Sequence, residues 1–222
     1  MDGRKYSSRG RKFRRAPLIA PRDEYFGHDT SFVRGYRKIA DAARAFNFDF
    51  RGKTVLDIGS STGGFTEYAL EKGAKKVIAI EKGSNQMKAP LRFDSRISLH
   101  EKTDIFDVKL EPTGIVQSTP DVIVADVSFV SLKKVLKHAS IYLADKHTNY
   151  LVMMKPQFEA RPQQLNRGVV KNEAMRRDII KDFEYWLKQN EFVIIKKRDN
   201  ELTGKTGNKE RFYWLFNTKH DS

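Results

Sequence analysis

Apolar and polar positions follow two different patterns along the chain. Short runs of apolar and β-branched residues recur from residue 54 onward, and such runs are typical of strands buried in a parallel sheet. Longer stretches between them repeat apolar residues every third or fourth position, which predicts amphipathic helices. The predicted strands are 54–56, 77–80, 97–99, 121–125, 150–154, 192–195 and 210–216. The predicted helices are 34–46, 65–72, a short one within 83–93, 132–143, and 172–189 with Asn172 as its N-cap.

This alternation of strands and helices predicts an α/β fold. Strands joined by crossover helices build a doubly wound, mostly parallel sheet, here of seven strands. The loop at 203–208 joins the last two strands directly, so one strand is expected to run antiparallel. A further loop is expected at 157–170. The predicted organisation is a basic arm at 1–30 followed by one domain at 31–222.

The sequence TVLDIGSSTGGF at 54–65 places a glycine-rich turn between the first strand and its helix. Gly59, Gly63 and Gly64 let the backbone approach a ligand closely, and a nucleotide-like ligand binds over such a turn. Their spacing matches neither the dinucleotide motif nor the phosphate loop. Asp57 would repel a phosphate but not a cationic, zwitterionic ligand. The pattern therefore favours S-adenosylmethionine over NAD or ATP, with an ordinary glycine-rich turn as the alternative.

Acidic residues after the next two strands support this interpretation. Glu81 lies 24 positions after Asp57, where a carboxylate is suited to accept hydrogen bonds from two ribose hydroxyls. Asp104 follows the third strand and could accept from an adenine amino group, although exposed acids are common in loops. The expected cofactor-binding residues are Asp57, Gly59, Ser60, Ser61, Gly63, Gly64, Phe65, Glu81, Lys82 and Asp104.

The charge balance indicates a polyanionic partner. The 222 residues include 42 basic and 28 acidic side chains, a formal net charge of +14. Residues 1–22 hold eight basic side chains and one acidic side chain, a composition typical of disordered segments that bind nucleic acid. A solubilising tail is the alternative for this arm, and an acidic membrane surface is the rival partner for the protein.

Several classes of protein are disfavoured by what the sequence lacks. It has no cysteine, so disulfides, thiolate metal sites and a cysteine nucleophile are excluded, as fits a reducing cytoplasm. No apolar run approaches the roughly 20 residues that cross a bilayer. The charged N-terminus lacks the apolar segment of a secretory signal. We therefore expect a cytoplasmic protein that does not insert into membranes and holds no metal.

Four charged residues lie at predicted strand ends, namely Asp57, Glu81, Asp126 and Lys155. Parallel strands bring their carboxyl ends to one edge of the sheet, where open α/β sheets bind ligands. Asp126 and Lys155 should therefore lie close together, near the reactive end of the ligand. Beside Asp126, Lys155 would stay charged and act mainly through its position. If burial and a second cation favoured its neutral form, it would instead serve as a general base.

Two more charged residues are expected at the same edge. Lys38 lies near the start of the predicted helix at 34–46 and is the candidate second cation. Glu210 begins the antiparallel strand, which starts at the edge where the parallel strands end. Unrelated surface ion pairs are the alternative interpretation of these residues.

Six segments carry a family resemblance: VRGYRKIADAARAF, VLDIGSSTGGFTEYALEKGAKKVIAIE, DVIVADVSFVSL, MMKPQFEA, RGVV and TGKTGNKERFYWLF. They resemble the haemolysin A (TlyA) family of FtsJ-like Rossmann methyltransferases. The resemblance implies methyl transfer from S-adenosylmethionine to a ribose 2′-hydroxyl of ribosomal RNA, free or in a ribosomal subunit. It also implies a catalytic tetrad of Lys38, Asp126, Lys155 and Glu210. In that tetrad Lys155 assists deprotonation of the hydroxyl, and the two acids hold the lysines in place.

The sequence departs from the family pattern at some points. Family members usually carry an N-terminal RNA-binding domain, where this chain has a basic arm of about 30 residues. Glu81 stands where aspartate is frequent in the family. The family name comes from a reported haemolytic activity, and nothing in the sequence supports pore formation. The alternative to a methyltransferase is an RNA-binding or membrane-active protein of the same fold without methyl transfer.

Overall fold

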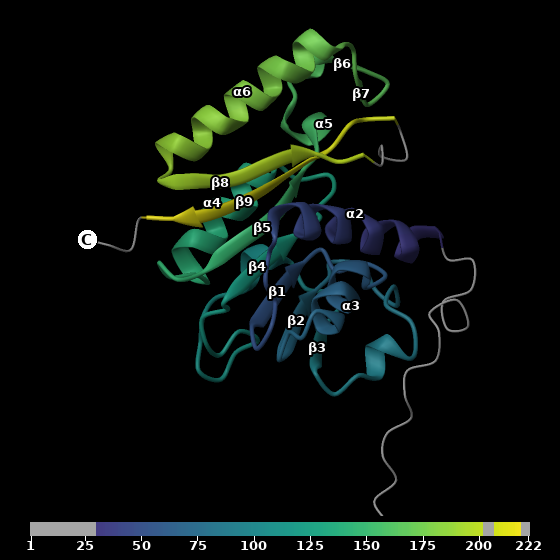
Figure 1. The fold of residues 1–222 in the computed structure, drawn as a ribbon, viewed down its shortest axis with the longest axis vertical. Coiled ribbons are helices and arrows are strands. Elements are labelled where there is room, and N and C mark those ends of the chain that lie inside the picture. Colours follow the sequence, from purple (N-terminus) through teal and green to yellow (C-terminus); the bar gives the residue numbers. More distant parts are fainter. Residues whose placement is uncertain (1–29, 202–206, 219–222) are drawn as a thin grey trace, which may run out of the picture.

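A computed structural model of the protein describes residues 30–201 and 207–218. The strands of its main sheet are β1 Thr54–Ile58, β2 Lys76–Ile80, β3 Ile97–His100, β4 Val122–Ala125, β5 Asn149–Met154, β8 Phe192–Asp199 and β9 Arg211–Asn217. They form a 7-stranded sheet in the order β3-β2-β1-β4-β5-β9-β8 (Figure 1). β1 to β5 pair in parallel, whereas β9 is antiparallel to both β5 and β8. The predicted mostly parallel sheet with one antiparallel strand is confirmed.

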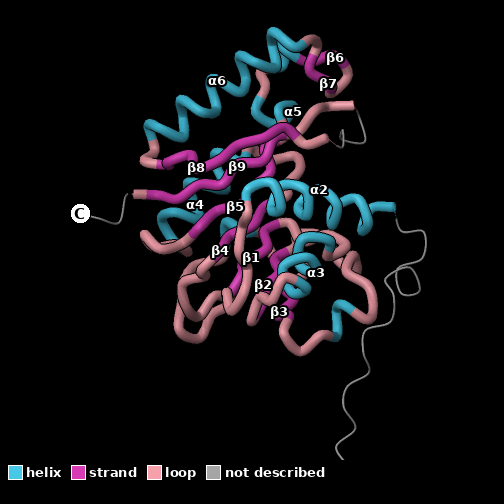
Figure 2. Tube along the Cα trace, viewed as in Figure 1, coloured by secondary structure: helices cyan, strands magenta, loops and turns pink. Residues whose placement is uncertain are grey.

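Helices cover both faces of this sheet (Figures 1 and 2). α2 (Thr30–Phe46) and α3 (Gly64–Glu71) pack on one face, and α4 (Leu132–Tyr142) and α6 (Glu173–Gln189) pack on the other. The shorter elements are α5 Pro156–Glu159, the 3₁₀ turns η1 Leu91–Phe93, η2 Ile105–Asp107 and η3 Pro162–Gln164, and the paired strands β6 Leu165–Asn166 and β7 Val169–Val170. Among the described residues, no helix combines the length and apolar character needed to cross a membrane.

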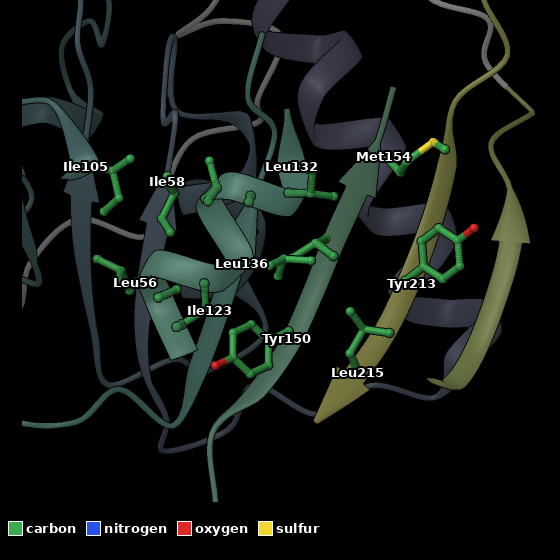
Figure 3. Close-up of a cluster of buried hydrophobic side chains, with 14 of the residues drawn as sticks. Leu56, Ile58, Ile105, Ile123, Leu132, Leu136, Tyr150, Met154, Tyr213 and Leu215 are labelled. Atoms are coloured by element: carbon green, nitrogen blue, oxygen red, sulfur yellow. The ribbon is translucent and has the colours of Figure 1, made fainter. Parts of the chain in front are cut away.

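Successive residues of each strand enter different cores, because strand side chains alternate between the two faces of a sheet. In β1, Leu56 and Ile58 belong to the cluster that includes α4 and α6, and Val55 belongs to the cluster that includes α2 and α3. Figure 3 shows the first cluster, in which side chains of α4 lie against those of β4 and β5. Burial on both faces explains why the strands appear in the sequence as continuous apolar runs.

Two predicted segments differ from the structure. The short helix predicted within 83–93 is wrong, because turns and bends occupy that stretch apart from η1. Gly83 and Pro90 disfavour a helix there, and the backbone N–H of Gln86 donates instead to the Glu101 carboxylate at 3.0 Å. The loop predicted at 157–170 is also more ordered than expected, since it contains most of α5 and all of η3, β6 and β7.

Element boundaries shift by a few residues. β8 runs to Asp199, beyond the predicted 192–195, because its polar second half keeps pairing with β9 past an irregularity between Ile194 and Lys196. Ile58, not Asp57, is the last residue of β1. The predicted cap of α6 is confirmed, since Asn172 Oδ1 accepts from the Met175 N–H at 2.9 Å. The basic arm predicted at 1–30 lies outside the described residues except for its last residue, so its role stays a prediction.

Candidate active site

A cavity of about 960 Å³ lies at the carboxyl ends of β1, β2, β4 and β5. All four members of the predicted tetrad, Lys38, Asp126, Lys155 and Glu210, line it. The predicted cofactor residues that line it are Gly59, Ser60, Ser61, Gly64, Phe65, Glu81, Lys82 and Asp104. The structure therefore brings together every predicted site residue except Asp57 and Gly63.

The first of two lysine–acid pairs joins α2 to the start of β9. Lys38 Nζ lies 2.6 Å from Glu210 Oε2, and their side chains are 8% and 3% exposed. The helix seats Ile39 fully in the core, and this packing fixes the backbone that carries Lys38. Because the pair is buried, removing one member would leave the other charge without compensation.

The second pair joins the ends of β4 and β5. Lys155 Nζ lies 2.5 Å from Asp126 Oδ1, and their side chains are 11% and 22% exposed. Asp126 Oδ1 accepts no directed hydrogen bond from a described residue, so this contact is a charge pair. Lys155 Nζ also donates to Ser128 Oγ at 2.8 Å. This second pair is more open to the cavity than the first, and its ammonium is held by two groups.

Packing explains two of the glycines in the turn after β1. Gly59 has a φ of +79°, and a Cβ placed there would lie 3.1 Å from the carbonyl oxygen of Asp126. Gly63 has a φ of +96°, and its Cβ would lie 2.4 Å from a methyl carbon of Leu91. Any other residue would strain the backbone at both positions, would crowd the Asp126 carbonyl at position 59 and would require Leu91 to shift at position 63. Gly63 thus shapes the turn from outside the cavity, whereas Gly59 keeps the turn close to the Asp126 backbone.

Asp57 lies behind the turn rather than in the cavity, because it is an inner residue of β1. Its side chain is fully buried, Oδ2 accepts from the Thr66 hydroxyl at 2.6 Å, and Oδ1 has no partner among the described residues. Burial raises its pKa to about 7 despite the Thr66 hydrogen bond, with smaller contributions from the charges of Asp126 and Glu81. Its predicted direct contact with the cofactor stays a prediction, and its visible role is to support the turn through α3.

The raised pKa of Asp57 makes protein stability depend on pH. The unfolded chain ionises this carboxyl above its ordinary pKa of 3.8, whereas the folded protein keeps it protonated up to about pH 7. Its contribution to stability is therefore full below pH 3.8 and is lost as the pH rises to 7. We expect Asp57→Asn to gain stability relative to the parent protein across this window, by a difference on the order of 4 kcal/mol. Urea unfolding at about pH 4.5, 6 and 8 measures this, and a difference constant with pH would contradict it.

Glu81 is held by the backbone around it. Its Oε2 accepts from the Ser61 N–H at 2.8 Å, and its Oε1 accepts from the Gly83 N–H at 2.6 Å. The Gln86 side chain donates to Oε1 at 3.2 Å. These bonds fix the carboxylate at the end of β2 beside the glycine-rich turn. Each carboxylate oxygen can accept more than one bond, so Glu81 retains capacity for a ligand hydroxyl.

Lys82 and Asp104 bind each other at the rim of the cavity. Lys82 Nζ donates to Asp104 Oδ2 at 2.8 Å, and this bond is the main reason why the pKa of Asp104 is lowered. Asp104 Oδ1 caps η2 by accepting from the Phe106 N–H at 3.1 Å. Gln86 and Phe106 were not predicted as site residues, although both line the same cavity. Their only signal in the sequence is nearness to Glu81 and Asp104.

An aromatic pair at the cavity was not predicted as part of the site. Phe129 is 93% exposed and has a φ of +63°, and its ring lies 5.3 Å from that of Phe158. Both residues line the cavity. Each belongs to a quoted family segment, DVSF or KPQFE, and lies three residues after Asp126 or Lys155. Phe129 therefore offers an exposed aromatic face at the cavity.

Glu159 ties the two loops that carry these residues. Its Oε1 accepts from the Leu132 N–H at 2.5 Å, and its Oε2 accepts from the Ser131 hydroxyl at 2.7 Å. Burial raises the pKa of this carboxyl. Through these bonds the N-terminus of α4, which follows Phe129, is joined to α5, which follows Lys155. The relative position of the two loops therefore depends on one partly buried acid.

Unsatisfied polar atoms in the cavity indicate a polar ligand. Ser60 Oγ and Gln157 Oε1 are buried and have no hydrogen-bond partner among the described residues, although both residues line the cavity. Buried polar atoms normally find a partner, so a ligand is expected to supply one. The volume, the closely approaching glycines and the fixed Glu81 carboxylate together fit a nucleoside with a charged side chain.

Comparison with known proteins gives the family. Residues 32–217 match the profile of the FtsJ-like methyltransferases. The chain is 34% identical over 183 residues to the 16S/23S rRNA (cytidine-2′-O)-methyltransferase TlyA of Mycobacterium tuberculosis, covering 82% of this chain and 67% of that protein. It is 32% identical over 180 residues to Hemolysin A of Brachyspira hyodysenteriae, covering 80% of this chain and 73% of that protein.

A solved structure agrees with these relatives. A candidate hemolysin from Streptococcus thermophilus has a TM-score of 0.79 and 29% sequence identity, over 87% of this chain and 70% of that one. The fold and the site define a methyltransferase of the FtsJ-like class. Within that class, the chain belongs to the TlyA (haemolysin A) family.

Proposed function

We propose that the protein transfers the methyl group of S-adenosylmethionine to a ribose 2′-hydroxyl of ribosomal RNA. The observation that carries this proposal is one cavity that brings together a glycine-rich turn, the fixed carboxylate of Glu81 and two lysine–acid pairs. The names of the relatives, which include rRNA cytidine-2′-O-methyltransferases, support the same substrate. The net charge of +14 suits a polyanionic RNA.

The cofactor would be held by the turn after β1 and by the acid that ends β2. Glu81 would accept hydrogen bonds from the ribose hydroxyls, and Gly59 would allow the backbone to approach the ligand. Ser60 Oγ, which has no partner among the described residues, would donate to a polar group of the cofactor. When bound, S-adenosylmethionine supplies an electrophilic methyl group on a sulfonium.

Lys155 would activate the RNA hydroxyl. A ribose 2′-hydroxyl is a poor nucleophile until its developing negative charge is stabilised, and the Lys155 ammonium, which lines the cavity, would supply that stabilisation. Asp126 and Ser128 orient this ammonium through contacts of 2.5 Å and 2.8 Å. Stabilisation of the developing alkoxide would be the first role of Lys155. Asp126 could then receive the proton, either directly or through Lys155.

Lys38, held by Glu210, would be the second ammonium of the cavity. An ammonium has three donors, and only one of those of Lys38 is needed for Glu210. The remaining donors would bind an oxygen of the RNA next to the reacting hydroxyl. Phe129, exposed beside Phe158, would contact a nucleobase, because base faces stack on aromatic rings.

A methyl-transfer assay on intact ribosomal subunits and on free ribosomal RNA tests this function. Labelled methyl groups should enter RNA in the presence of the parent protein and appear at a 2′-oxygen when the modified nucleotide is mapped. An RNA that is bound tightly but never methylated would favour the alternative of an RNA-binding protein without turnover. Failure to bind S-adenosylmethionine at millimolar concentration would contradict the proposal itself.

Glu81→Ala should weaken S-adenosylmethionine binding about 10- to 100-fold. Loss of a hydrogen bond to a charged group costs about 1.5–3 kcal/mol, which corresponds to this range. Titration calorimetry measures the affinity, and Glu111→Ala, which removes an exposed acid outside the cavity, is the matched control. Unchanged affinity in a folded Glu81→Ala protein would show that the ribose does not bind at the end of β2.

A further inference from the structure

The paired strands β6 and β7 form a small hairpin next to the catalytic edge. They follow α5 in the chain, and Figure 1 places them near α5 and the N-terminal end of α6. Val169 and Val170 of β7 line a small depression together with Pro156, which directly follows Lys155. The hairpin therefore packs against the same short segment that carries the candidate catalytic lysine.

A buried asparagine, Asn208, anchors this hairpin to the segment that precedes β9 and carries Glu210. Asn208 Oδ1 accepts from the Val170 N–H at 3.0 Å, and Asn208 Nδ2 donates to the Gly168 carbonyl at 3.1 Å. Asn208 is 4% exposed and lies two residues before Glu210. The hairpin is thereby fixed relative to Lys155 on one side and to Glu210 on the other.

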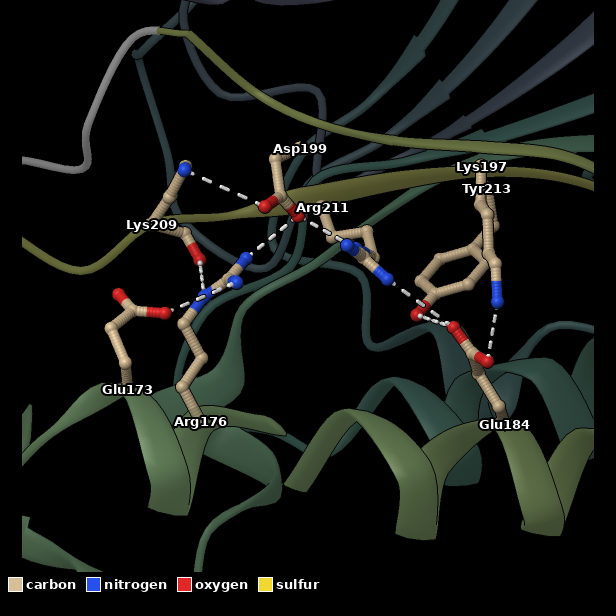
Figure 4. Close-up of polar contacts among 8 residues, drawn as sticks. All are labelled: Glu173, Arg176, Glu184, Lys197, Asp199, Lys209, Arg211 and Tyr213. Carbon is tan, nitrogen blue, oxygen red and sulfur yellow. Dashed lines mark hydrogen bonds and ion pairs between the residues drawn. The ribbon is translucent and has the colours of Figure 1, made fainter. Parts of the chain in front are cut away.

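An ionic network behind the hairpin holds the segment around Glu210 (Figure 4). Arg176 Nε donates to the Lys209 carbonyl at 3.1 Å, and its guanidinium also bonds Asp199 at 2.7 Å. Asp199 accepts in addition from Arg211 at 2.6 Å. Burial alone would raise the pKa of Asp199, but the bonds from the two arginines outweigh it and lower the pKa to about 2. The residue next to Asn208 is thus held by Arg176, whose charge is paired with Asp199.

Among the described residues, the cations at 161–171, the segment that contains the hairpin, are not paired with acids as those of this network are. Residues 161–171 contain Arg161, Arg167 and Lys171 and no acidic residue. All three side chains are exposed, and none forms an ion pair with a described residue. Arg167 lies in the two-residue tip of the hairpin, with a φ of +49°. Three exposed positive charges are therefore presented on a backbone fixed beside the cavity.

We propose that this hairpin binds the phosphate backbone of the RNA next to the target nucleotide. The inference rests on the proposed function, since it assigns a contact to the RNA of that reaction. Fixed cations bind phosphates at low entropic cost and release condensed counterions, which makes affinity fall with salt. An anchor shared with Lys155 and Glu210 would let this contact set the position of the ribose in the cavity.

The test removes the three charges together in Arg161→Ala/Arg167→Ala/Lys171→Ala. Binding of the RNA that the parent protein methylates is measured over a range of salt concentrations. The variant should bind more weakly, and the slope of log affinity against log salt should fall by about 2, since each phosphate contact contributes roughly 0.7–0.9. Affinity for S-adenosylmethionine should not change. An unchanged salt slope would overturn the inference.

Two further variants separate this contact from net charge and from folding. Arg177→Ala/Lys181→Ala/Lys188→Ala removes three exposed cations from α6 and should leave the slope nearly unchanged. If both triple variants lowered the salt slope equally, the hairpin cations would contribute only through net charge, and the inference would be overturned. Arg161→Lys/Arg167→Lys keeps the charges and should retain the slope. If the parent protein methylates RNA but the triple hairpin variant keeps the parent's salt slope, only the hairpin contact is refuted. If the parent protein binds RNA through the hairpin without methylating it, only the proposed reaction is refuted.

Discussion

Lys155→Ala should lower methyl transfer by about 10²–10⁴-fold while leaving S-adenosylmethionine affinity largely unchanged. The expected loss is large because Lys155 is held at the end of β5 by Asp126 and Ser128, inside the cavity. Without it, Asp126 loses its ion-pair partner among the described residues, and the forming alkoxide would lose the stabilising charge of that ammonium. Single-turnover methyl transfer, measured together with cofactor binding by calorimetry, separates chemistry from binding.

Lys155→Arg distinguishes between two roles of this residue. A guanidinium keeps the charge but has a different shape and stays protonated, so we expect this variant also to be inactive. Near-full activity of Lys155→Arg would show that the residue acts as a fixed charge and not in proton transfer. Near-full activity of Lys155→Ala on a proven RNA substrate would refute the tetrad.

Glu210→Ala should lower the free energy of unfolding by about 3–5 kcal/mol and also reduce methyl transfer. Lys38 and Glu210 pair at 2.6 Å with almost no exposure, so truncation of the acid would leave a buried ammonium without its partner. Urea unfolding measures the loss. Glu173→Ala is the control, because its 3.9 Å contact with Arg176 leaves Glu173 69% exposed, and such pairs contribute about 0–1 kcal/mol.

A double variant separates the structural role of this pair from its role in the reaction. Lys38→Met/Glu210→Leu removes both charges and fills the space, so much of the stability lost in Glu210→Ala should return. Methyl transfer should stay low, because the second ammonium of the cavity is absent. A double variant with full activity would show that Lys38 and Glu210 serve only the fold. A stable Glu210→Ala protein would contradict the prediction about burial.

The two lysine–acid pairs divide the tasks expected of the site. The Lys38–Glu210 pair is enclosed between α2 and the start of β9, and so fixes a charge and links two elements. The Lys155–Asp126 pair is more exposed, and one oxygen of Asp126 lacks a directed hydrogen bond from the described residues. The second pair is therefore the more accessible of the two to a substrate.

Much of this arrangement was determined by local sequence. Apolar runs specify strands buried on both faces, and amphipathic stretches specify the helices that cover them, so the order of elements follows from periodicity. In a parallel sheet the strand ends meet at one edge, so the positions of Glu81, Asp126 and Lys155 after apolar runs suffice to place them together. The glycines of the turn were recognisable because few other residues tolerate the backbone angles seen at Gly59 and Gly63.

Only the tertiary structure decided features that depend on distant partners. In the stretch 83–93, which forms no α-helix, the Gln86 N–H bonds Glu101, and in the β6–β7 hairpin two backbone groups bond Asn208. Asp57 faces Thr66 instead of the cavity, a direction that strand alternation and packing set. The direct contact between Lys38 and Glu210 was likewise open, since composition and spacing do not specify contacts between a helix and a distant strand. These contacts form between residues far apart in the chain, where periodicity carries no information and only the packed fold determines the neighbours.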